Sequence, residues 1–157
     1  MNRQEAVEEL MRMASQELPE HKSHIEPAPV GMSAHRSSVI FKKSENKAQY
    51  IQIYYKSEDD ILPALAHEMG HVMTLPELGG VPFYQESYQN EYDAEFKASQ
   101  WACAWLVEHV EDDRILNSCL QRLQLALDSY WHFYQEHRIP MNPRYILTMF
   151  RMEEVEA

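Results

Sequence analysis

Two long helical patterns in the second half of the chain limit most strictly what it can fold into. Small residues such as Ala94 and Ala98 recur on one face of residues 87–110, which is the spacing of an amphipathic helix. A second helix is expected over residues 112–137, and Pro140 follows it because proline cannot continue the helical hydrogen-bond ladder. With 157 residues the chain is about the size of one domain. Helices of this length must therefore share one core.

The first third of the chain predicts one helix and a small sheet. Residues 2–18 carry apolar side chains at three-and-four spacing, which favours a surface helix. Prolines and a glycine predict a loop over residues 19–33. Residues 38–43 and 48–56 are rich in β-branched and aromatic side chains, and the polar insert between them predicts a hairpin. The expected fold is an α+β, mostly helical single domain with a small antiparallel sheet packed beside the helix that carries the motif described below.

A third helical pattern lies between the hairpin and the two long helices. Residues 57–60 offer an N-cap and acidic first-turn side chains, and the apolar run after them predicts a helix over residues 61–73. Residues 75–85 contain two prolines and two glycines, so a turn is expected there. A last short helix is expected from residue 142 toward residue 152.

Composition excludes some classes of partner and compartment. The formal net charge of −11 repels a phosphate backbone, so this chain alone is not expected to bind nucleic acid. Its first residues are acidic and amphipathic, and no run of about 18 apolar residues occurs, which argues against a signal peptide and a membrane span. A soluble, cytoplasmic protein is expected. Cys103 and Cys119 have no metal-binding spacing and are expected to be buried free thiols.

The clearest chemical signal is the run His67-Glu68-Met69-Gly70-His71. Two histidines four residues apart point the same way on a helix, so both imidazoles can bind one ion. Glu68 lies on the adjoining edge of that face, where its carboxylate can reach a water without ligating the metal. The motif predicts His67 and His71 as metal ligands and Glu68 as the catalytic general base.

A catalytic zinc site needs a third protein ligand and an open position for water. Glu91 lies on a helical face with small residues such as Ala94, which would let its helix approach the motif helix closely. We predict Glu91 as the third ligand. Glu95 shares this face one turn further on and is the rival ligand; its other expected role is to orient a ligand histidine. The metal-site core is expected over roughly residues 39–110, followed by a helical part over residues 112–157.

The motif is followed, after a loop, by residues 90–94 (Asn-Glu-Tyr-Asp-Ala) and a long helix. This arrangement resembles the gluzincin class of metallopeptidases and, within it, the ImmA/IrrE family. Glu91 and Ala94 match the Glu-x-x-Ala pattern of that family. The resemblance covers residues 39–106. It implies a small α+β domain, zinc (Zn²⁺) held by the two histidines and Glu91, and hydrolysis of a regulatory protein such as a transcriptional repressor.

The expected function is therefore that of a zinc-dependent endopeptidase, in which Glu68 takes a proton from water and delivers it to the leaving amine. An oxyanion also needs a hydrogen-bond donor, and Tyr84, Tyr88, His132 and Tyr134 are the candidates. The alternative function is a zinc-binding protein-interaction or sensor domain with little or no proteolytic activity. A metal-free helical domain that carries the motif by chance is the third hypothesis.

Overall fold

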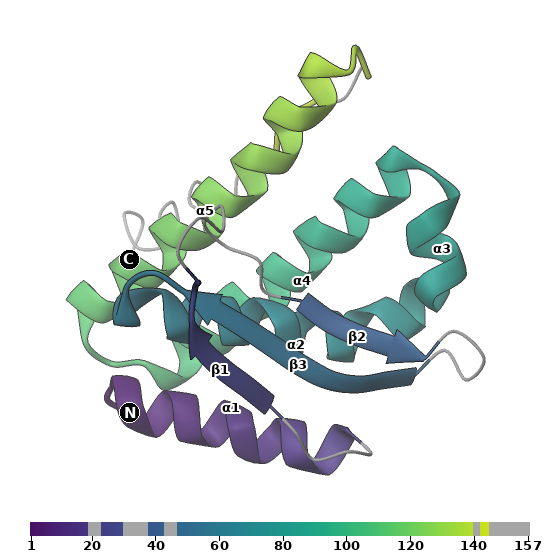
Figure 1. The fold of residues 1–157 in the computed structure, drawn as a ribbon. Coiled ribbons are helices and arrows are strands. Elements are labelled where there is room, and N and C mark those ends of the chain that lie inside the picture. Colours follow the sequence, from purple (N-terminus) through teal and green to yellow (C-terminus); the bar gives the residue numbers. More distant parts are fainter. Residues whose placement is uncertain (19–22, 30–37, 43–46, 140–141, 145–157) are drawn as a thin grey trace.

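The computed structural model of the chain describes residues 1–18, 23–29, 38–42, 47–139 and 142–144 (Figure 1). A short 3-10 helix, η1, leads directly into the helix that carries the histidine motif. The elements in chain order are α1 (Arg3–Glu17), β1 (Ser23–Pro27), β2 (Ser38–Lys42), β3 (Lys47–Tyr55), η1 (Glu58–Asp60), α2 (Ile61–Leu78), α3 (Gly80–Glu86), α4 (Tyr88–His109) and α5 (Asp113–Glu136).

α1, α4 and α5 begin where the sequence predicts, because a polar side chain caps each start. Asn2 accepts a hydrogen bond from the backbone N–H of Glu5, whose side chain accepts in return from Asn2, so α1 opens with a capping box. Ser87 caps α4 by accepting from the N–H of Asn90. Asp112 does the same for α5. The predicted helices over residues 2–18, 87–110 and 112–137 are thus confirmed to within a residue or two. The helix expected after residue 142 lies mainly on residues 145–157, outside the described residues.

The sheet is mixed, which corrects the expectation of a purely antiparallel one. Its strand order is β1-β3-β2. β2 pairs antiparallel with β3, whereas β1 pairs parallel with β3 in a register that sets Ile25 opposite Ile53. β1 lies within residues 19–33, where a loop was expected. Pro27 is compatible with a strand there because β1 is an edge strand, where a missing backbone donor costs no ladder hydrogen bond, and partly buried Ile25 packs against the core.

Helical structure also replaces the turn that was expected over residues 75–85. α2 continues through Pro76. It ends at Gly79, whose φ of +118° is open to glycine and strained for other residues. α3 then begins at once, and Pro82 is its third residue. The first N–H groups of a helix have no intrahelical acceptor, so a proline there removes no hydrogen bond. This accounts for Pro82, whereas Pro76 lies inside α2 and lacks the hydrogen bond that another residue would donate there.

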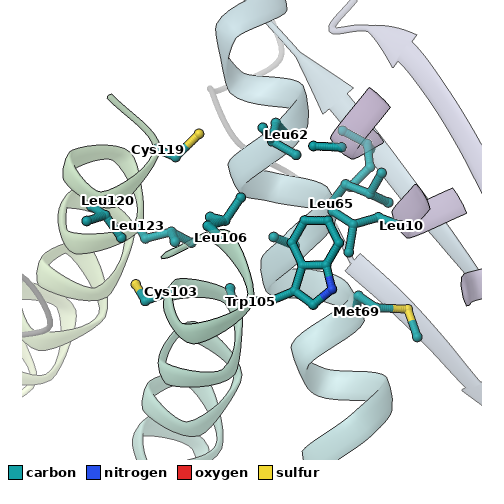
Figure 2. Packing of buried hydrophobic residues seen from close by; sticks show 14 of the residues in the cluster. Leu10, Leu62, Leu65, Met69, Cys103, Trp105, Leu106, Cys119, Leu120 and Leu123 are labelled. Atoms are coloured by element: carbon teal, nitrogen blue, oxygen red, sulfur yellow. The ribbon is translucent and has the colours of Figure 1, made fainter. Parts of the chain in front are cut away.

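α2 is the central element of the molecule. It contacts α1, α4 and α5 as well as β3, and Leu62 and Leu65 on it are fully buried. Figure 2 shows these side chains facing Trp105 and Leu106 of α4, with the α5 leucines closing the far side. α1 lies along the sheet at the opposite end of the molecule from the tip of α5 (Figure 1). This burial fixes α2 in place, and therefore also the polar face on which its histidines lie.

The two cysteines are part of this core. Cys103 of α4 and Cys119 of α5 are buried free thiols, as predicted. Burial raises the pKa of Cys119 to about 11, so the thiol stays protonated near neutral pH and behaves as a small apolar side chain. Among the helices that the structure describes, none is long and apolar enough to cross a membrane.

Candidate metal centre

Two neighbouring helices bring two imidazoles and one carboxylate together. Oε2 of Glu95 on α4 lies 2.7 Å from Nε2 of His67 and 3.0 Å from Nε2 of His71, both on α2. One ligand atom from each of the three side chains lies within 4.8 Å of the others. The three side chains are 4–14% exposed. They form a nearly buried group at one edge of the contact between α2 and α4.

A glycine inside the motif allows α4 to approach this closely. A Cβ at residue 70 would lie 2.2 Å from the carbonyl oxygen of Ala98, far inside van der Waals contact. With hydrogen in place of a side chain at Gly70, the α4 backbone passes directly beside the turn that joins His67 to His71. Glu95 precedes Ala98 by one helical turn, so its carboxylate falls beside the imidazoles.

Further hydrogen bonds orient two of the three side chains. Nδ1 of His67 lies 2.8 Å from Oγ of fully buried Ser99, which leaves Nε2 free to act as a ligand if Nδ1 carries the proton. The Tyr84 hydroxyl on α3 donates to Oε1 of Glu95 over 2.9 Å. Burial and the adjacent Glu95 charge raise the pKa of Tyr84, so this phenol remains a donor. Oε1 of Glu95 is thus held by Tyr84 while Oε2 faces the histidines.

The electrostatics of the group favour the ionised form of Glu95. Burial by itself would raise the pKa of this carboxyl, but His71 and the hydrogen bonds to both histidines hold the pKa well below its usual value. A deprotonated carboxylate is the form that ligates a metal. The group therefore offers two imidazole nitrogens and one carboxylate oxygen.

Glu91, predicted as the third ligand, lies elsewhere. It does not belong to the group of His67, His71 and Glu95, and it lines the neighbouring cavity instead. Burial and the charge of Glu95 raise the pKa of Glu91. The residue that the structure brings to the two histidines is instead Glu95, one turn along the same face. Helical periodicity gives both residues the same direction, so the choice between them depends on where α4 crosses α2.

Glu68 borders a cavity of about 500 Å³ next to these side chains. The carboxylate is largely buried and shares the cavity lining with His67 and Glu91. Apolar side chains of α2 and α5 form much of the remaining wall. These are Pro63, Ala64, Leu123, Leu125, Ala126 and Phe133. A mostly apolar wall with a few polar groups, here a carboxylate and an imidazole, is typical of a concave binding site for an organic substrate.

The four predicted oxyanion donors are not placed equally. Tyr84 is engaged by Glu95, Tyr134 is fully buried, and Tyr88 is 48% exposed and packs on Phe133. His132 is exposed and contacts the neighbouring Trp131 ring. None of these four lines the cavity beside Glu68.

Sequence analysis missed two residues of the site. Ser99 follows Glu95 by four residues on the same face of α4, so the small-residue stripe could have indicated it. Tyr130 of α5 lines the cavity and precedes Tyr134 by four residues, so both lie on one face of that helix. The helical spacing of Ser99 and Tyr130 can be read from the sequence, but it does not distinguish them from ordinary core positions.

The donor set fits zinc, which is bound in proteins by histidine nitrogen and carboxylate oxygen. The contacts of 2.7 and 3.0 Å are those of hydrogen bonds. Tetrahedral zinc ligands stand roughly 3.3 Å apart, given bond lengths near 2.0–2.1 Å, so binding would require Oε2 of Glu95 to move away from each imidazole by some tenths of an ångström. Comparisons with protein families, with characterised proteins and with solved structures found no match to this chain.

Proposed function

We propose that this chain is a zinc-dependent metallopeptidase with His67, His71 and Glu95 as metal ligands and Glu68 as general base. One observation carries the proposal: the three ligand atoms converge beside a cavity that Glu68 also lines. A structural zinc site is closed by four protein ligands, whereas a catalytic one keeps a position open. Three protein ligands next to a cavity correspond to the catalytic kind.

When bound, the ion would lower the pKa of a water molecule and polarise the substrate carbonyl. Glu68 accepts a proton from the attacking water and delivers it to the nitrogen of the leaving amine. Ser99 and Tyr84 hold His67 and Glu95 in orientation through their hydrogen bonds. The apolar wall of the cavity takes a substrate side chain and excludes water from the site.

The resemblance of the motif to the ImmA/IrrE family supports the same proposal and extends it to a substrate class. Glu95 and Ala98 also satisfy the Glu-x-x-Ala pattern, so the corrected ligand keeps the resemblance. We propose a cytoplasmic peptidase that cleaves a regulatory protein such as a transcriptional repressor. The ligand group and the general base account for hydrolysis of a peptide bond, and the resemblance adds the regulatory role.

The variant Glu68→Gln tests the proposal. Loss of the base should lower the rate of peptide cleavage by about 10²–10⁴-fold, whereas zinc content should not change because Glu68 is not among the ligands. Both are measured on purified, zinc-loaded protein with an internally quenched peptide library and by atomic absorption. Glu77→Gln, at an exposed position on the same helix, is the matched control and should retain full activity.

Two results would refute the peptidase proposal. Equal cleavage by wild-type protein and Glu68→Gln would remove the general base from the mechanism. Stoichiometric zinc in a wild-type protein that cleaves no peptide would instead favour the zinc-binding interaction or sensor domain.

A further inference from the structure

The cavity beside Glu68 contains a hydroxyl group that the mechanism so far does not use. Tyr130 lies on α5 and lines this cavity together with His67, Glu68 and Glu91. Glu95, Glu68 and Glu91 are among the nearby charges that act on its hydroxyl. Tyr130 of α5 therefore lies near the ligand group, on the side of that group that borders the cavity.

We propose that Tyr130 is a catalytic residue whose hydroxyl donates a hydrogen bond to the oxyanion of the peptide bond being cleaved. This inference rests on the proposed peptidase function. It names the donor that such a reaction needs, since tetrahedral intermediates are stabilised by hydrogen bonds aimed at the developing negative charge.

The phenol of Tyr130 keeps its proton under the conditions of the reaction. A phenol ordinarily ionises only at about pH 10. Its O–H is therefore a hydrogen-bond donor at neutral pH. The Tyr130 hydroxyl can therefore donate a hydrogen bond to a negatively charged oxygen that forms in the cavity.

Other polar side chains of the cavity are engaged in contacts of their own. Arg122 pairs with Asp60 and lies 3.9 Å from Asp59. The hydroxyl of Ser129 donates to the helix backbone at Ala126 over 2.9 Å. Tyr54 accepts a hydrogen bond from Gln52 over 2.6 Å, which leaves its own proton available, but no contact between described residues places it beside Glu95. Of the donors that line the described part of the cavity, Tyr130 combines a phenolic proton with proximity to Glu95 and Glu68.

Each bond and proton in the step is accounted for. Water adds to the carbonyl carbon and gives one proton to Glu68, while the carbonyl oxygen gains the electron pair of the broken π bond. Tyr130 donates a hydrogen bond to this oxygen, and Tyr84 continues to hold Glu95 through Oε1. The carbon–nitrogen bond then breaks, and the proton on Glu68 passes to the amine. Tyr130 retains its own proton throughout.

The test compares Tyr130→Phe with Tyr84→Phe in the zinc-loaded, full-length protein. With an internally quenched peptide that wild type cleaves, Tyr130→Phe should lower kcat by about 10²–10³-fold, the usual cost of one oxyanion donor. KM and zinc affinity should stay within about twofold, because the lost interaction belongs to the transition state. Tyr84→Phe should instead weaken zinc binding by about tenfold or more, since Tyr84 orients a ligand.

Binding of a phosphinic peptide, a tetrahedral mimic of the intermediate, gives a readout other than activity. Tyr130→Phe should weaken its binding by the same factor as kcat/KM, measured by calorimetry. A crystal structure of the wild-type complex tests the geometry without any variant. A phosphinate oxygen at about 2.7 Å from Oη of Tyr130 is the expected hydrogen bond, and a phosphinate with no hydrogen bond to Tyr130 would overturn the inference.

The outcomes separate this inference from the function on which it rests. If wild type cleaves peptides and Tyr130→Phe cleaves them equally fast, Tyr130 has no catalytic role although the peptidase proposal stands. If Tyr130→Phe loses zinc as Tyr84→Phe does, Tyr130 is a positioning residue for Glu95. If zinc-loaded wild type neither cleaves peptides nor binds the phosphinic peptide, the peptidase proposal itself fails.

Discussion

Two glutamates one helical turn apart share a direction but occupy different environments. Glu95 is 3% exposed and contacts both motif histidines, whereas Glu91 is about half-buried and borders the cavity. A buried carboxylate is costly unless cations or hydrogen bonds compensate for its lost hydration. At Glu95 the histidines and Tyr84 provide that compensation, and a metal ion would add to it.

The separate variants Glu95→Gln and Glu91→Gln test this difference. Glu95→Gln should weaken zinc binding by more than about 100-fold, because removing a ligand exceeds the roughly 10–100-fold effect of losing an orienting contact. Glu91→Gln should retain zinc with an affinity within about threefold of wild type, less than the roughly tenfold effect of losing an orienting contact. The reason is that Glu91 does not belong to the ligand group. Competition with a chromogenic chelator measures both affinities. Zinc loss in Glu91→Gln alone would return the ligand role to Glu91.

At the scale of elements, the site depends on how closely two helices pass. The α2–α4 contact brings Gly70 against the backbone of Ala98, and Glu95 and Ser99 lie on either side of that point along α4. Small residues on both helices permit this approach, as the stripe of alanines on α4 predicts. Helix packing thus sets the distance between the imidazoles and the carboxylate.

Gly70→Ala tests that dependence. In an ordinary helix interior the change from glycine to alanine stabilises by about 1 kcal/mol. Here the added methyl group would meet the Ala98 carbonyl, so overpacking should destabilise the protein by about 1–3 kcal/mol and weaken zinc binding. Urea unfolding and chelator competition measure the two effects. Glu77→Ala on the exposed face of α2 is the control, and a gain in stability from Gly70→Ala would contradict the close approach.

At the scale of the whole molecule, metal binding and folding are coupled. The proposed ligands come from α2 and α4, and Tyr84 of α3 donates a hydrogen bond to the same carboxylate. An ion bound there would therefore connect three helices in the folded state. In the unfolded chain these side chains are separated, so the ion binds the folded state preferentially.

Removal of zinc should accordingly lower the melting temperature. At free zinc about 100 times the Kd, binding stabilises by about 2.7 kcal/mol, which corresponds to about 5–10 °C for a domain of this size. Calorimetry with and without a chelator measures the shift. Glu95→Gln should show a shift of less than about 2 °C, because its weaker binding leaves free zinc at or below its Kd. Equal shifts in both proteins would place the stabilising metal elsewhere.

Local sequence determined the parts of this protein that depend on neighbours along the chain. The caps at Asn2, Ser87 and Asp112 began helices where they were predicted, and the four-residue spacing of His67 and His71 placed two imidazoles on one face. Proline patterns were less informative, because the effect of proline depends on whether its N–H would have had an acceptor. Pro27 on an edge strand and Pro82 in a first helical turn were both compatible with regular structure.

The tertiary structure alone decided which distant groups meet. Periodicity fixes the direction of Glu91, Glu95 and Ser99 on α4, but it does not fix the height at which α4 crosses α2. The crossing point follows from the contact between Gly70 and Ala98. It brings the carboxylate of Glu95, rather than that of Glu91, beside the two imidazoles. The parallel pairing of β1 with β3 and the approach of Tyr130 from α5 depend in the same way on packing between segments far apart in sequence, which short-range patterns do not encode.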